Sequence, residues 1–227
     1  RAAGLCFPLG FAGVWTLGEF ARGLLFTGFP WNLAAHAIPP GSIPSQAAAY
    51  VGVYGLSFAV AALAGGFALI AWRLPVAAGV RVAGVGALVV AAGWSRPPAP
   101  PIAADAPLIR VVQPNNPQRD KWVRDLRGAH FANLLDLSSA PADRPVRLVV
   151  WPETSAPFDI AADDAARRVV AERALAAGSA ALIGSPRRGP DGRVRNSLVA
   201  IAAGGAPPVI YDKHHLVPFG EYVPFGD

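Results

Sequence analysis

The stretch Leu-Val-Val-Trp-Pro-Glu at residues 148–153 places Glu153 directly after an apolar, β-branched run. A second stretch, YDKHHLVPFGEYVP at residues 211–224, places Lys213 in the same way after the run PVIY. Such runs predict buried strands, and sheet enzymes often present catalytic side chains where strands end. With Glu221, eight residues further on, these residues provide a base, a cation and a second acid, a set suited to acyl transfer through a nucleophile. We expect Glu153 and Lys213 to converge on one cavity at the end of a shared sheet, with Glu221 close to Lys213.

Each of these residues also has an ordinary interpretation. A loop glutamate is more often a solvated surface group than a base, and a lysine after a strand is more often a surface cation. Lys213, however, is followed by His214 and His215 and then by a rigid Pro-Gly-aromatic loop, which is an unusual surface. The two histidines suggest a metal site, but adjacent residues alternate faces in an extended chain and no spaced third ligand follows. We therefore expect neither a metal nor a cofactor.

The chain from residue 105 to residue 227 predicts an α/β domain. The predicted strands are 108–113, 147–151, 180–184, 198–202 and 208–211, and the predicted helices are 118–137 and 161–177. The dipeptide Asp191-Gly192 indicates a hairpin turn. Because strands outnumber helices after Gly178, a layered fold with antiparallel hairpins fits better than a doubly wound parallel sheet.

Residues 1–104 have a different composition and predict a transmembrane helical region. Only six charged residues occur there, and none lies between Arg22 and Arg73. A soluble domain cannot usually leave fifty residues without charge, because its surface needs charged groups. The formal net charge of +5 comes mostly from this apolar part and forms no basic patch, so we expect no nucleic-acid partner.

Three apolar segments are predicted to cross the membrane: 2–17, 46–72 and 76–94. The second contains no charged residue and exceeds the roughly 20 residues that a membrane-spanning helix needs. The third contains Arg81, which lies near its start and can reach the membrane interface. The aromatic and Pro-rich residues 20–44 predict an interfacial loop, with a packed connector as the alternative. Arg73 and Arg81 bracket a short turn that the positive-inside rule makes cytoplasmic, so we expect residues 105–227 to be extracytoplasmic.

The single cysteine, Cys6, lies in the first apolar segment. Buried apolar cysteines are usually inert packing residues. The chain contains no methionine, and several apolar segments follow one another rather than one signal peptide. We expect a fragment of a longer membrane protein, truncated at both ends.

At the two strand ends the sequence resembles the apolipoprotein N-acyltransferases, the membrane branch of the nitrilase superfamily. The motifs that carry the resemblance are W-P-E at 151–153 and Y-x-K-x-x-L-V-P-F-G-E-Y-V-P at 211–224. In the apolar half, GEFARG at 18–23 and TGFPW at 27–31 resemble the signature that precedes the family's catalytic domain, and residues 113–122 resemble the segment that enters its first helix. The resemblance covers nearly the whole chain and implies transmembrane helices followed by a layered αββα nitrilase-like domain, here incomplete.

The resemblance also implies roles for single residues. Glu153 matches the family's general base, Lys213 the lysine that stabilises the tetrahedral intermediate, and Glu221 a further essential acid. Trp122 and Tyr222 match positions where substrate is bound. The implied partners are a phospholipid acyl donor, a diacylglyceryl lipoprotein acceptor and the bacterial inner membrane.

The family's nucleophile is a cysteine beyond the lysine motif, which would carry the acyl chain as a thioester. The resemblance places that cysteine after Asp227, so residues 1–227 alone are expected not to turn over. Two alternatives stay open: a membrane-attached nitrilase-type amidase that uses water as acceptor, and a non-catalytic membrane scaffold. The residues alone indicate a membrane-tethered α/β enzyme with a Glu/Lys/Glu site, and acyl transfer comes from the resemblance.

Overall fold

The computed structural model describes residues 2–71, 76–204 and 206–224, and the chain forms two compact units. The first consists of residues 1–100 together with 215–227, and the second consists of residues 101–214. The predicted division after residue 104 lies close to the first of these boundaries. The second boundary separates the Lys213 end of the sheet from the loop that contains Glu221 and Tyr222.

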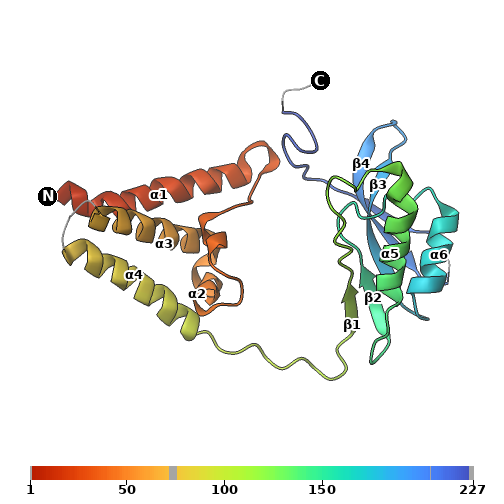
Figure 1. The fold of residues 1–227 in the computed structure, drawn as a ribbon, viewed down its shortest axis with the longest axis horizontal. Helices are drawn as coiled ribbons and strands as arrows, with labels where there is room; N and C mark the ends of the chain where they lie inside the picture. The colour runs from red at the N-terminus through yellow and green to blue at the C-terminus, as the bar shows by residue number, and fades with distance from the viewer. Residues whose placement is uncertain (1, 72–75, 205, 225–227) are drawn as a thin grey trace. The chain divides into compact units, whose positions relative to one another are not determined.

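The first unit is built on three long helices, shown in red to yellow in Figure 1. They are α1 (Ala2–Leu24), α3 (Ala48–Ala71) and α4 (Val76–Trp94), and α3 packs against both of the others. The connector between α1 and α3 contains two 3₁₀ helices, Leu25–Thr27 and Ala34–Ala37, and the short helix α2, Ile43–Gln46. Small side chains such as Ala12, Ala61 and Ala62 are buried where the helices meet, which lets the backbones approach closely.

The described residues of the three predicted membrane segments lie largely in helices. The bounds differ, because α1 continues to Leu24, past the predicted end at residue 17 and into the predicted interfacial loop, and α3 begins at Ala48. Among the described residues, one helix, Ala48–Ala71, is both long enough and apolar enough to cross a membrane, and Val82–Trp94 is a shorter apolar helix. Large apolar side chains of α1 point outward, with Val14 74% and Leu17 68% exposed. An exposed apolar surface of this kind is typical of a membrane or partner contact. The number of crossings stays a prediction, and the Arg73–Pro75 turn lies outside the described residues.

The second unit contains a five-stranded sheet in the order β1–β2–β3–β4–β5. The strands are β1 (Leu108–Val111), β2 (Val146–Val150), β3 (Ala180–Arg188), β4 (Val194–Ala202) and β5 (Val209–Asp212). The first three strands are parallel, and β4 and β5 are added as antiparallel neighbours. Because β5 therefore runs in the same direction as β2, the ends of β2 and β5 lie at the same edge of the sheet.

The predicted hairpin turn is confirmed, and the strands on both sides of it are longer than expected. Gly192 has a φ of 76°, and Gly189 N–H donates to the Arg193 carbonyl at 2.9 Å. The strand predicted to end at residue 184 continues to Arg188, and the next begins at Val194. The added residues of both strands include arginines and Asn196. These polar residues interrupt the apolar runs from which the strands were predicted.

The two helices, α5 (Arg127–Ser139) and α6 (Asp164–Ala174), are shorter than the sequence predicted. Residues 118–123 form turns instead of the first helical turns, because Asp120 N–H donates to the Pro117 carbonyl and Val123 N–H to the Asp120 carbonyl. A 3₁₀ turn, Arg124–Leu126, then leads into α5. The start of α6 is set by Asp163, whose Oδ1 accepts a hydrogen bond from Ala166 N–H at 2.9 Å.

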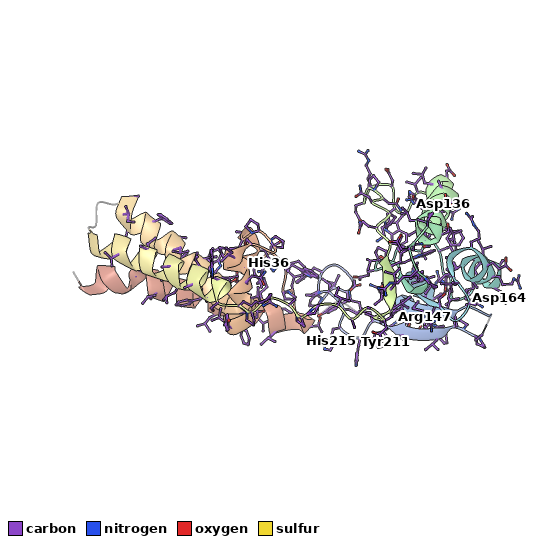
Figure 2. All side chains as sticks on the ribbon, turned by 90° about the horizontal axis from the view of Figure 1, so that it is seen from below. His36, Asp136, Arg147, Asp164, Tyr211 and His215 are labelled. Carbon is purple, nitrogen blue, oxygen red and sulfur yellow. The ribbon has the colours of Figure 1, made fainter. Side chains whose placement is uncertain are left out.

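Both helices cover the same face of the sheet (Figure 1). Asp136 on α5 accepts a hydrogen bond from Arg173 of α6 at 2.9 Å, and Figure 2 labels Asp136 and, on α6, Asp164. The core under the helices is apolar and includes Leu134, Leu135, Val149, Val170, Ala181, Ile183, Val199 and Ile201. The α/β class is thus confirmed, and the described residues supply one helical layer and one sheet layer of a nitrilase-like domain.

The other face of the sheet is also apolar. The alternation of side chains places Val111, Leu198, Val209 and Tyr211 on it, and these are 75%, 38%, 72% and 60% exposed. Near-continuous apolar strands are typical of a sheet that is covered on both faces. The second sheet and second helical layer of the predicted αββα arrangement stay a prediction.

Candidate active site

Trp151 anchors the end of β2 in the core. Its side chain is 2% exposed, and its indole N–H donates to Ser138 Oγ of α5 at 2.8 Å. The ring of Phe131 packs edge-on against it at 6.1 Å. Trp151 N–H also donates to the Leu182 carbonyl at 2.8 Å, so both backbone and side chain are held directly before Pro152 and Glu153.

The turn that carries Glu153 runs closely over β3. Ala156 N–H donates to the Gly184 carbonyl at 3.0 Å, which brings the chain back to the sheet after the turn. Thr154 adopts a φ of 46°, an uncommon conformation for a residue with a β-branched side chain. Strain of this kind is often found at functional sites, where the surrounding contacts hold it.

The end of β5 is held by a cluster of polar side chains around Asp212. The Asp212 carboxylate accepts from Arg187 Nε at 3.0 Å, from Ser197 Oγ at 2.7 Å and from Arg195 Nη1 at 3.1 Å. The hydrogen bonds from Arg187 and Ser197 hold the pKa of Asp212 well below its usual range. The next residue, Lys213, donates its backbone N–H to the Asn196 carbonyl at 2.7 Å.

Glu153 and Lys213 meet at this edge of the sheet, although sixty residues separate them. Lys213 Nζ lies 3.0 Å from Glu153 Oε1, and the side-chain amide of Asn196 donates to the same oxygen. The Lys213 side chain is 29% exposed and that of Glu153 is 62% exposed. The convergence expected from the two strand ends is therefore present. A carboxylate beside an ammonium can accept a proton while the cation stabilises a developing oxyanion.

A small polar cavity of about 170 Å³ adjoins Glu153. Its lining consists of Gln113, Pro114, Asn115, Asn116, Gln118, Lys121, His130, Pro152, Glu153 and Ser155. Lys121 Nζ donates to Thr154 Oγ1 at 2.8 Å, which ties the cavity wall to the Glu153 turn. Trp122, expected to bind substrate, lies next to it, 49% exposed, with its ring centroid 5.6 Å from Lys121 Nζ.

Glu221 and Tyr222, the other two predicted site residues, belong to the first unit. Glu221 Oε2 accepts from Val217 N–H at 2.7 Å and so closes its own loop. Tyr222 Oη donates to the Phe26 carbonyl and lies 3.2 Å from Thr27 Oγ1. The expected proximity of Glu221 to Lys213 and the substrate contact of Tyr222 stay predictions.

The loop of Glu221 also borders a cavity of about 670 Å³ in the first unit. Its lining is predominantly apolar and comes from Gly18, Ala21, Arg22, Leu25, Phe26, Phe29 and Val217–Gly220. Four of these residues, Gly18, Ala21, Arg22 and Phe29, belong to the two motifs of the apolar half that the sequence singled out. The structure thus joins those motifs to the loop that follows Lys213.

Two residues of the site were missed by sequence reasoning. Asn196 lies in the part of β4 that was not predicted as strand, and Gly184 was read only as the end of β3. Extending the hairpin symmetrically from Asp191-Gly192 would have placed Asn196 in the sheet. The proximity of Asn196 to Glu153 depends on the register of the strands, which cannot be read from the local sequence pattern.

Comparison with known families gives two matches. Residues 1–66 match the apolipoprotein N-acyltransferase N-terminal domain, and residues 108–227 match the carbon-nitrogen hydrolase family. The second match includes Glu153, Asn196, Lys213 and Glu221.

Comparison with single proteins gives relatives named apolipoprotein N-acyltransferase. The relative from Caulobacter vibrioides is 37% identical over 244 residues, which cover 99% of this chain and 44% of the relative. The relative from Brucella melitensis is 37% identical over 239 residues, 97% of this chain and 43% of the relative. The relative from Rhodopseudomonas palustris is 32% identical over 232 residues, 92% of this chain and 42% of the relative. The chain therefore spans less than half the length of these relatives.

Proposed function

Because this chain belongs to the carbon-nitrogen hydrolase family and begins with a match to the N-terminal domain of apolipoprotein N-acyltransferases, we propose that it is part of an enzyme that N-acylates apolipoproteins. The observation that carries the proposal is the ion pair between Glu153 and Lys213, in a chain whose other unit is an apolar helical bundle. An acid–cation pair suits acyl transfer, and an apolar bundle suits a lipid donor.

In the first half-reaction, Glu153 takes the proton of a cysteine thiol, and the sulfur attacks the carbonyl carbon of a phospholipid ester. Lys213 stabilises the oxyanion of the tetrahedral intermediate. The ester C–O bond then breaks, and the lysophospholipid oxygen leaves with the proton that Glu153 returns. The thiol belongs to the cysteine that the resemblance places after Asp227.

In the second half-reaction, the α-amine of a diacylglyceryl cysteine attacks the thioester carbonyl. Glu153 accepts the amine proton, Lys213 again stabilises the oxyanion, and the C–S bond breaks. The sulfur leaves as thiolate and recovers the proton from Glu153, so the enzyme returns to its starting state. The product is an N-acylated lipoprotein, because the acyl chain now forms an amide with the α-amine of the acceptor.

The first unit supports a lipid donor and a membrane location. The cavity of about 670 Å³ is lined by apolar side chains and by one cation, Arg22, a combination that suits an acyl chain with an anionic headgroup. With α1, α3 and α4 as membrane spans, the protein is a multi-pass protein of the bacterial inner membrane. The charge bias around the α3–α4 turn supports an extracytoplasmic location for residues 105–227.

The test is transfer of a labelled acyl chain from phospholipid to a diacylglyceryl lipopeptide by the full-length protein in detergent. Glu153→Gln should block thioester formation, and Lys213→Ala should slow transfer by roughly 10²–10³-fold, the usual loss of an oxyanion-stabilising group. Lys213→Arg should restore only part of the rate, because a planar guanidinium does not replace a compact ammonium.

Glu172→Gln is the matched control, since Glu172 is an exposed glutamate of α6. It should transfer acyl chains at the wild-type rate. Wild-type transfer by Glu153→Gln would show that the site is wrongly assigned. Release of free fatty acid in place of N-acyl lipopeptide would favour an amidase-type enzyme, and a wild-type protein without either activity would favour a scaffold.

A further inference from the structure

We propose that Asn196 is a positioning residue of this site, which holds Glu153 by one carboxylate oxygen so that the other oxygen accepts the proton from the nucleophile. The inference rests on the proposed function of Glu153 as the base. It assigns a task to a residue that lies outside both of the motifs that identify the site.

The contacts of Asn196 connect the two halves of the ion pair. Its side-chain amide donates to Glu153 Oε1, and its backbone carbonyl accepts from Lys213 N–H at 2.7 Å. Lys213 Nζ reaches the same Oε1 at 3.0 Å. Both donors therefore bind Oε1, and within the described part of the chain no hydrogen bond reaches Oε2. Proton transfer is directed to the oxygen that the two donors leave open.

The position of Asn196 is held by the strands on both sides. Asn196 pairs with Pro186 of β3 in the hairpin register, and its neighbours Arg195 and Ser197 both bind Asp212 of β5. Ser197 is 2% exposed. A side chain between two anchored residues of a central strand has little freedom to move, so its amide can restrain Glu153 at low entropic cost.

A neutral amide is the appropriate donor at this position. Lys213 already supplies the positive charge at Glu153, and on the other side Lys121 and His130 line the adjoining polar cavity. Without Asn196, Glu153 would be held by Lys213 alone and could rotate to present both oxygens to it. After that rotation, both oxygens of Glu153 would bind Lys213. The carboxylate would then be less available as a base, and the ammonium less available to stabilise an oxyanion.

Two variants test the inference. Asn196→Ala removes the donor and should lower kcat by about 10–100-fold with little change in KM, since the geometry of the base and not substrate binding is affected. Asn196→Asp places a second carboxylate against Glu153, which disfavours the ionised form of Glu153. The acidic limb of its pH–rate profile should therefore shift to higher pH. A residue that only stabilised the sheet would not move this limb.

Val194→Asp is the matched control, because it adds the same charge on the same strand at a side chain that is 68% exposed. It should leave the acidic limb in place. An Asn196→Asp protein with the acidic limb and rate of wild type would overturn the inference, as would an equal shift in Val194→Asp.

The titration of Glu153 can also be followed without turnover, by ¹³C NMR of labelled glutamate carboxyls with Glu153→Gln as the assignment reference. If wild type shows no acyl transfer, the proposed function fails, while an upward shift of the Glu153 titration in Asn196→Asp still supports the contact. If Asn196→Asp does not fold, Asn196→Ser is measured in its place. Serine is too short to reach Glu153, so its kcat should fall like that of Asn196→Ala, and an unchanged kcat would count against the inference.

Discussion

A Cβ atom on residue 184 would lie 2.7 Å from Glu153 Cα, a separation that real Cβ contacts essentially never show. Gly184 has no such atom, and the turn of the candidate base occupies the space. The same Cβ would lie 2.2 Å from the Pro152 carbonyl oxygen and 2.7 Å from Thr154 N. These neighbours are backbone atoms, so they cannot move away by a change of rotamer.

Gly184→Ala should therefore displace Glu153 from Lys213 and lower acyl transfer at least tenfold, because small misplacements of catalytic groups are costly. It should also lower the free energy of unfolding by about 1–3 kcal/mol, the usual cost of overpacking. Gly128→Ala on α5 is the control, since a Cβ there would have no neighbour within 4 Å. Transfer and thermal unfolding in detergent are the measurements, and equal behaviour of the two variants would contradict the prediction.

Asp212 should stabilise the second unit in a pH-dependent way. Its pKa is lowered in the folded state, so its contribution is complete above the unfolded-state pKa of about 3.9 and is lost as the pH falls below it. Asp212→Asn should lower the free energy of unfolding near pH 7 by about 1–3 kcal/mol, because Arg187 loses its charged partner.

The difference between wild type and Asp212→Asn should stay constant from pH 7 to about pH 5 and shrink below about pH 4. Thermal unfolding followed by circular dichroism across this range measures it. Asp191→Asn is the control, because Asp191 is more exposed and binds Arg195 at the hairpin tip. A difference that grows as the pH falls would be opposite to this prediction.

Glu19 should act as a structural acceptor in the helical unit. It is 6% exposed, and its Oε1 accepts from Trp15 Nε1 at 3.0 Å and from Ala34 N–H at 2.7 Å. Glu19→Gln keeps an acceptor oxygen for both donors and should change the melting temperature little. Glu19→Ala removes the acceptor oxygen from both donors, which should lower the free energy of unfolding by about 1–3 kcal/mol for each donor. This variant should therefore melt at a clearly lower temperature in detergent. Equal melting of the two variants would exclude this role.

The sidedness of the second unit can be tested by cysteine labelling in a background in which Cys6 and the cysteine expected after Asp227 are replaced by alanine. Asp191→Cys, at the exposed hairpin tip, should react with a membrane-impermeant maleimide added to the extracytoplasmic side. Arg73→Cys should react only from the cytoplasmic side, because the positive-inside rule places its turn there. Labelling of Asp191→Cys only from the cytoplasm would reverse the topology.

Much of the architecture follows from local patterns in the sequence. Apolar, β-branched runs before Glu153 and Lys213 predicted β2 and β5, because such side chains favour strands. Both strands are present, but β5 is mostly exposed and not buried as the sequence predicted. The absence of charged residues between Arg22 and Arg73 indicated the apolar helices of the first unit. This signal depends on whether a residue lies in an apolar environment, and not on which other segment it contacts. Both patterns can be read from the sequence without knowing which segments contact one another in the folded protein.

Pairing between distant segments was decided only by the tertiary structure. The hairpin register brings Asn196 beside Glu153, and the crossing of the Glu153 turn over β3 requires Gly184, yet neither residue has a local signal for these contacts. The same holds for the Asp212 cluster, whose arginines lie on the neighbouring strands. The sequence determined that residues such as Glu153 and Lys213 follow strands, since that depends on nearest neighbours along the chain. Which of them share a site depends on strand order and register, and a slip of one residue would turn each side chain to the opposite face.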